Sequence, residues 1–74
     1  MTPAQCRAAR ALLGLEQSDI ARSAGIARAT VVDFEKGVRT PRAKTIDAIC
    51  AALEQHGVKF IEENGDGVGV RMKK

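Results

Sequence analysis

Residues 17–37 read QSDIARSAGIARATVVDFEKG, and this stretch decides the fold of the 74-residue chain. It predicts two short helices, over residues 17–24 and about 27–36, separated at Gly25, because glycine takes a left-handed turn without steric cost. Helices joined so tightly must cross closely, and Ala21 supplies the small side chain that such a crossing needs. The pair therefore turns one face of its second helix outward.

Apolar residues are spaced so that they hold this helix pair together. Val31 and Phe34 lie three positions apart, on one face of the second helix, and Ile20 and Ile26 face them from the preceding segment. Gly37 follows the last residue of the pattern and is expected to end the helix.

Two further helices are predicted on either side of the pair. The first covers residues 3–13: Thr2 and Gln5 have the spacing of a capping box, Pro3 suits the first helical position, and Gly14 ends the helix. The other covers residues 43–56 and ends at Gly57. Its apolar residues follow the i, i+3, i+4, i+7 spacing of an amphipathic helix: Ile46, Ile49, Cys50 and Leu53.

The end of the chain has a different character. Residues 58–62 and 68–72 favour strands, and Asn64-Gly65-Asp66-Gly67 between them is a strong turn signal. Setting Phe60 opposite Val70 places the apolar residues on one face: Val58, Phe60, Val68, Val70 and Met72. The sequence therefore predicts a mainly α protein, with a four-helix domain over residues 1–57 and a C-terminal β-hairpin over residues 58–74.

Size and composition narrow the function. The chain forms one domain with 45% hydrophobic residues, and its net charge of +3 permits nucleic acid or an acidic surface as a partner. We expect no cofactor or metal, and no enzymatic activity, since no Ser-His-Asp or Cys-His set, no phosphate loop and no zinc set is present in the sequence.

The two cysteines, Cys6 and Cys50, are expected to be buried free thiols that act as small apolar residues. A disulfide between them is conceivable, but nothing in their spacing supports it. The sequence contains no signal-peptide pattern, and no apolar run approaches the roughly 18 residues of a membrane span, so we expect a cytoplasmic protein.

The central residues resemble a known family. Five landmarks occur with gap-free spacing: Gln17, Ala21, Gly25, Glu35-x-Gly37 and Pro41. Over about residues 3–56 the chain is similar to the phage-repressor (Cro/repressor, XRE-type) helix-turn-helix proteins. It departs from their pattern at Ala27 and Glu16, where a small polar residue usually caps the helix. The resemblance implies a regulator of transcription, most simply a repressor, that places residues 27–36 in the DNA major groove.

The resemblance also implies roles for individual residues. Base contacts are expected from the exposed positions of the second helix of the pair: Arg28, Ala29, Thr30, Val32 and Asp33. Contacts to DNA phosphates are expected from Gln17, Lys36, Arg39 and Arg42. Arg28 is expected to hydrogen bond to guanine. Three roles are open for Asp33: it accepts a hydrogen bond from cytosine N4, it orients Arg28, or it repels other base sequences. Arg10 and Glu35 are expected to form a structural ion pair, and His56 to lie at a helix C-terminus, where a cation is favoured.

The hairpin is not needed to complete the helical unit, so a different role is expected for it. A two-stranded hairpin alone is marginal and has open edges. We expect a homodimer, in which the hairpins of two copies form one sheet or pack face to face through Val58, Phe60, Ile61, Val68, Val70 and Met72. In the alternative, the hairpin folds back over its own helices. A second class of function stays open: an antitoxin-like or adaptor module whose main partner is another protein.

Overall fold

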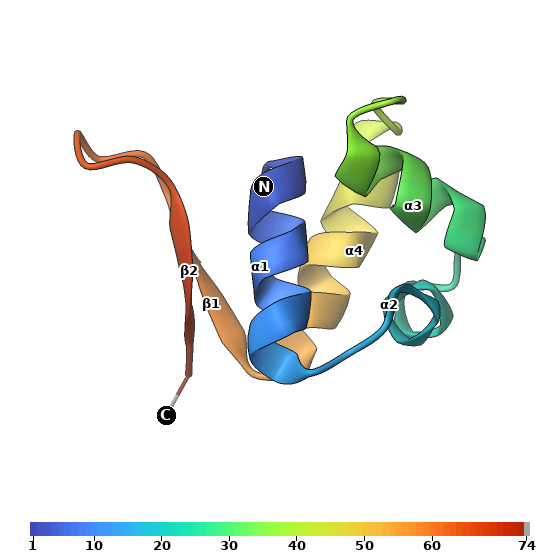
Figure 1. The fold of residues 1–74 in the computed structure, drawn as a ribbon, viewed down its shortest axis with the longest axis horizontal. Coiled ribbons are helices and arrows are strands. Elements are labelled where there is room, and N and C mark those ends of the chain that lie inside the picture. The colour runs from blue at the N-terminus through green and yellow to red at the C-terminus, as the bar shows by residue number, and fades with distance from the viewer. Residues whose placement is uncertain (74) are drawn as a thin grey trace.

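The computed structural model describes residues 1–73, which form four helices and a two-stranded hairpin (Figure 1). Their order is α1 (Pro3–Leu13), α2 (Gln17–Ala24), α3 (Arg28–Lys36), α4 (Ala43–Gln55), β1 (Val58–Ile61) and β2 (Gly69–Met72). The predicted fold class is therefore confirmed. Lys74, the last residue of the predicted hairpin segment, lies outside the described residues. Within residues 1–73, no helix is both long enough and apolar enough to cross a membrane.

The helix ends follow the local sequence. Thr2 and Gln5 form the predicted capping box, because the Thr2 hydroxyl accepts from the Gln5 N–H at 3.1 Å and the Gln5 side-chain oxygen accepts from the Thr2 N–H at 2.8 Å. At the start of α2 the Glu16 N–H donates to the Asp19 carboxylate at 2.9 Å. Ala27 caps α3 without a side-chain hydrogen bond, so this helix start lacks the usual polar cap.

Gly25 makes the tight turn between α2 and α3. Its φ of 70° lies in the left-handed region, which a residue with a Cβ rarely adopts. The Ile26 N–H then donates to the Ala21 carbonyl at 3.0 Å, which closes the end of α2. This turn sets the two helices against each other, with Ala21 only 4% exposed where they meet.

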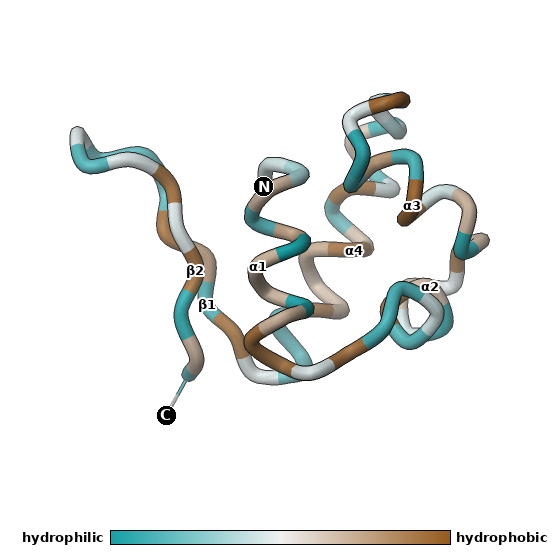
Figure 2. Tube along the Cα trace, in the orientation of Figure 1, coloured by the Kyte–Doolittle hydropathy of each residue, from teal (hydrophilic) through white to brown (hydrophobic). Residues whose placement is uncertain are grey.

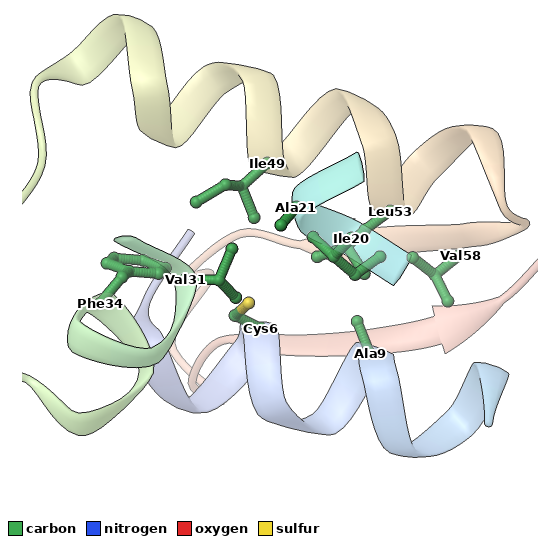
Figure 3. Close-up of a cluster of buried hydrophobic side chains, with 9 residues drawn as sticks. All are labelled: Cys6, Ala9, Ile20, Ala21, Val31, Phe34, Ile49, Leu53 and Val58. Atoms are coloured by element: carbon green, nitrogen blue, oxygen red, sulfur yellow. The ribbon is translucent and has the colours of Figure 1, made fainter. Parts of the chain in front are cut away.

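A single apolar core joins all four helices to the hairpin. Figure 3 shows side chains from α1, α2, α3, α4 and β1 converging between the helices. The fully buried members include Ile20, Val31, Ile49, Leu53 and Val58. Because Val58 belongs to β1, the first strand completes the core of the helical unit instead of extending away from it.

The hairpin has the predicted register and packs on its own helices. Phe60 pairs with Val70, and Val58 with Met72. The strands lie against α1 and α4, on the side of these two helices opposite to α2 and α3 (Figure 1). The side-chain amide of Gln5 fixes the hairpin from α1, donating to the carbonyls of Gly69 at 2.8 Å and Ile61 at 3.3 Å.

The structure therefore shows the folded-back arrangement of the hairpin. Along the strands, apolar residues alternate with polar ones (Figure 2). Of the apolar set, Val58 belongs to the core, and Phe60 and Val70 pack against it. Among the six residues expected at a dimer interface, Val58 is fully buried, Phe60 and Val70 pack against the core, and Ile61 is partly buried. Only Val68 and Met72 remain largely exposed, at 46% and 45%. A dimer interface formed by the whole apolar face of the hairpin would require Val58 to leave the core.

Candidate nucleic-acid interface

Helix α3 buries one side and exposes the other. Val31, Phe34 and Glu35 are at most 3% exposed and face the other helices. With 3.6 residues per turn, the remaining positions form two adjacent rows along the outer surface. These rows contain Arg28, Val32 and Lys36 in one and Ala29 and Asp33 in the other. Arg28, Ala29 and Lys36 are exposed, whereas Val32, Asp33 and, at the edge, Thr30 are partly buried. All the predicted base-contacting positions are thus brought to one surface or its border.

The predicted ion pair between α1 and α3 is present and buried. Arg10 grips the Glu35 carboxylate with two hydrogen bonds of 2.7 Å, and it also donates to the Leu15 carbonyl at 3.1 Å. The Glu35 side chain is 3% exposed and that of Arg10 is 21% exposed. This contact fixes the buried side of α3 to α1 and to the turn that leads into α2.

Two partners of the Glu35 carboxylate, and one of its main-chain carbonyl, were not anticipated from the sequence. The Gln17 amide donates to Glu35 at 3.0 Å, and the Cys6 thiol donates to the other carboxylate oxygen at 3.1 Å. Arg7 also donates to the main-chain carbonyl of Glu35. Cys6 lies four residues before Arg10 and hence on the same face of α1, which is the sequence signal that could have indicated its role.

This network reaches the outer surface of α3. Since Glu35 holds the amide nitrogen of Gln17, the amide oxygen of Gln17 is free to accept from Arg28, at 3.5 Å. Arg28 and Gln17 line a surface hollow together with Arg10, Glu16 and Ser18. The buried Glu35 carboxylate therefore orients Gln17, whose side chain contacts Arg28, the first residue of α3.

Burial and hydrogen bonding act in opposite directions on these titratable groups. Burial by itself would raise the pKa of Glu35, but the hydrogen bonds from Arg10, Gln17 and Cys6 outweigh it and hold that pKa below its ordinary value. Burial, reinforced by the hydrogen bond to Glu35, raises the pKa of Cys6 to about 12. The Cys6 thiol therefore stays protonated at neutral pH and serves as a hydrogen-bond donor.

Both cysteines are free in the structure, as predicted. Cys6 is fully buried, whereas Cys50 is only partly buried, so the expectation of two buried thiols holds fully for Cys6 alone. His56 lies at the C-terminus of α4, as expected, and its ring is 3.1 Å from the Ser23 hydroxyl.

A second hollow lies along α3, lined from the helix by Ala29, Thr30 and Asp33. Asp33 lines it together with Arg39 and Arg42, from the loop that leads into α4. Lys36, Arg39 and Arg42 are all exposed, so the last residue of α3 and the loop that follows it carry three cations. Asp33 and Arg28 line different hollows, and the hydrogen bond of Arg28 goes to Gln17, so the geometry does not support the reading in which Asp33 orients Arg28.

These features define a class of protein: a small helical domain with a tightly turned helix pair. The second helix of the pair is fixed on its buried side by an ion pair, and its exposed side is flanked by cations. A family model described as helix-turn-helix matches residues 7–58. The chain belongs to this family, the XRE/Cro-type helix-turn-helix proteins. The comparison with curated proteins gives no match.

Membership of the family establishes the general activity. The protein is a DNA-binding regulator of transcription, and its partner is double-stranded DNA. Proteins of this family are generally not enzymes. The match runs from the middle of α1 to the first residue of β1, and most of the hairpin lies beyond it.

Proposed function

We propose that the protein is a repressor that occupies an operator by inserting α3 into the major groove. The observation that carries this proposal is the exposed surface of α3, where Arg28 is oriented by Gln17 and the opposite end is bordered by cations. A pre-oriented side chain loses less freedom when it binds, so the network behind α3 favours specific contacts. The cytoplasm, where we expect this protein, is the corresponding site of action.

The proposed base contacts follow from the chemistry of each side chain. Arg28 donates two parallel hydrogen bonds to the O6 and N7 atoms of guanine. Val32 and Ala29 offer methyl groups to thymine, and Thr30 contacts the base edges from the border of the surface. Asp33 accepts from the N4 amine of cytosine or rejects bases that present only acceptors. The resulting half-site contains at least one guanine near the N-terminus of α3.

Phosphate contacts are proposed around this surface. Lys36, Arg39 and Arg42 would neutralise phosphates beside the C-terminal end of α3, and Gln17 would bind one beside Arg28. Such contacts position the protein without reading the sequence. Two copies on neighbouring half-sites, about 34 Å apart, would then give the affinity that a single small domain lacks.

Selection of bound duplexes from a random DNA pool tests this function directly. The expected result is an enriched motif with two-fold symmetry and half-sites one helical turn apart, each with a fixed guanine. Enrichment of no motif would contradict sequence-specific binding, and a motif without symmetry would contradict the paired half-sites.

The proposed phosphate contacts predict a salt dependence. Arg42→Ala and Lys36→Ala should each weaken binding to all duplexes alike, and each should reduce the slope of log affinity against log salt concentration by about one. Fluorescence anisotropy titrations at several salt concentrations measure this slope. Arg22→Ala is the matched control, because Arg22 is an exposed cation of α2, with its side chain 76% exposed, that is proposed neither as a phosphate contact nor in the hairpin. An unchanged slope for both test variants would contradict the phosphate contacts.

A second candidate function is supported by one observation. The hairpin exposes Val68, just before β2, and Met72 on the side of the molecule away from α3, where an extended segment of another protein could bind. An antitoxin-like or adaptor protein would use this surface for its partner and DNA for autoregulation. In that case the isolated protein is expected to be monomeric and to select single, unpaired half-sites.

A further inference from the structure

The outer edge of β2 is an open strand edge whose hydrogen-bonding groups can be assigned. The Lys73 N–H donates to the Gly57 carbonyl at 2.8 Å, which continues the β1–β2 ladder by one pair. Hydrogen-bonded and non-hydrogen-bonded pairs alternate in an antiparallel ladder. Because Gly57 and Lys73 form a hydrogen-bonded pair, Val58–Met72 and Phe60–Val70 are non-hydrogen-bonded pairs. The N–H and C=O groups of Val70 and Met72 therefore point away from β1.

A groove runs beside this edge, between β2 and α1. Val68, Gly69 and Val70 line it from the hairpin, and Ala4, Gln5 and Ala8 line it from α1. Ala4, Ala8 and Ala11 are exposed and follow the i, i+4, i+7 spacing, so they form one stripe of small side chains along α1. Small side chains let a second helix approach closely. The groove thus combines unused strand donors and acceptors with a surface suited to close packing.

We propose that β2 pairs with β2 of a second copy of this chain, antiparallel about a two-fold axis at Val70. The two hairpins then form one four-stranded sheet, and the alanine stripes of the two α1 helices face each other beneath it. This inference deepens the proposed function, on which it rests in one respect: an operator with two half-sites requires two copies.

The side chains select this register over its neighbour. With the axis at Val70, Val68 lies opposite the partner's Met72, so the exposed apolar residues of the hairpin cover one another. Arg71 lies opposite the partner's Gly69, which has no side chain. Moving the axis to Arg71 would set Arg71 directly against the partner's Arg71, and like charges in opposed positions are destabilising.

The charges of the hairpin are complementary in this pairing. Its tip is acidic, with Glu62, Glu63 and Asp66, and its other end is basic, with Lys59, Arg71 and Lys73. Antiparallel pairing brings the tip of one copy to the basic end of the other. In the chosen register Lys73 lies opposite the partner's Gly67. The Glu63 carboxylate already accepts from the Gly67 N–H at 3.0 Å, which holds it beside that position.

The symmetry also suits DNA binding. Each hairpin packs its helices against one face only (Figure 1). A two-fold axis perpendicular to a continuous sheet keeps both helical units on the same side of that sheet, where both α3 helices can reach one duplex. Packing the hairpins face to face would place the two helical units on opposite sides. Edge pairing is therefore the arrangement that fits a single operator.

Sedimentation equilibrium of the full chain without DNA tests the proposal. We expect a dimer at about 100 μM protein, and we expect the double variant Val68→Lys/Met72→Lys to be monomeric there, since lysines on an edge oppose strand pairing. Ile61→Lys is the matched control, because Ile61 lies on the outer face of the hairpin, and it should remain dimeric. A cooperative thermal transition of each variant confirms that it folds, whereas the melting temperature itself is expected to fall when the dimer is lost.

The opposite results would overturn the proposal. A monomeric wild-type chain, or a double variant that dimerises as well as the wild type, excludes pairing at the β2 edge. Loss of the dimer in Ile61→Lys alone indicates face-to-face packing. These measurements contain no DNA, so their failure can be distinguished from failure of the proposed function. A dimer that selects no DNA motif contradicts only the repressor. A monomer that selects a single half-site contradicts this inference and the paired half-sites, but not sequence-specific DNA binding.

Cross-linking tests the register itself. In a Cys50→Ser background, Gly69→Cys combined with Arg71→Cys should yield disulfide-linked dimers under mild oxidation, because the paired register brings these two positions within disulfide distance across the axis. A Cβ at Gly69 would be 3.6 Å from the nearest atom of Ile61, an ordinary contact, so the substitution fits. Gly69→Cys or Arg71→Cys alone should not cross-link. Equal cross-linking of the single and double variants would contradict the register.

Discussion

Replacing Glu35 with alanine should lower the free energy of unfolding by about 3–5 kcal/mol. The change leaves Arg10, Gln17 and Cys6 without the carboxylate on which their hydrogen bonds converge. We expect a value near the lower end of that range, because the Arg10 side chain is 21% exposed and can recover part of its hydration. Urea denaturation of the two proteins, followed by circular dichroism, measures the difference.

Two further variants serve as comparisons for Glu35→Ala. Glu54→Ala removes an exposed carboxylate from α4 and should change the stability by no more than about 0.5 kcal/mol. Replacing Arg10 and Glu35 together with apolar residues of similar volume should recover much of the loss, since the desolvation of both charges is then avoided. A Glu35→Ala protein that unfolds like the wild type would show that the pair contributes nothing.

The same carboxylate predicts how stability depends on pH. Because the pKa of Glu35 is lowered in the folded protein, its contribution is fully present above its ordinary value of 4.5 and is lost as the pH falls through the folded pKa. The wild-type protein should therefore lose more stability below about pH 4.5 than Glu35→Gln does. Parallel curves for the two proteins in that range would contradict the assignment.

Replacing Arg28 with alanine should weaken binding to the selected operator by about 1–3 kcal/mol for each half-site and relax the preference at one base pair. The reason is that Arg28 is the side chain on α3 best suited to guanine, and Gln17 orients it for that contact. Repeating the selection from a random pool with the variant measures the change in preference, and anisotropy titrations measure the affinity.

Arg22→Ala is the control for this experiment. Arg22 is an exposed arginine of α2, with its side chain 76% exposed and 3.6 Å from Asp19, so its loss removes the same charge from another part of the domain. We expect Arg22→Ala to leave the selected motif unchanged. If Arg28→Ala also leaves the motif unchanged, α3 does not read DNA through its first residue, and the proposed docking of the helix is wrong.

Much of the fold follows from local rules that can be read along the chain. The turn at Gly25 needs a residue that tolerates positive φ, and the capping box at Thr2 and Gln5 needs only neighbouring residues. The hairpin register follows from the period of two in a strand, because a shift by one residue would scatter the apolar side chains. The spacing of residue types along the chain is sufficient to predict each of these features.

The buried network is partly beyond sequence reasoning. The Arg10–Glu35 pair was anticipated because the resemblance to XRE-type proteins implies it. The additional contacts of Glu35 with Cys6 and Gln17 depend on how α1, α2 and α3 converge in space. The spacing of Cys6 and Arg10 places both on one face of α1, but it does not show what that face meets, and Gln17 has no such signal. Only the packed helices show that Cys6 and Gln17 hydrogen bond to one carboxylate.

The position of the hairpin is the clearest example of a feature that only the tertiary structure determines. The sequence by itself determined the helix pair, the flanking helices, the two strands and their register, because these depend on spacing, caps and turn residues. It left open whether the apolar face of the hairpin covers a second copy or its own helices, since burial of Val58 and Phe60 is equally favourable against either surface. The tertiary structure decided for the chain's own helices, because α1 and α4 leave an apolar surface that β1 completes and the Gln5 amide satisfies two hairpin carbonyls there.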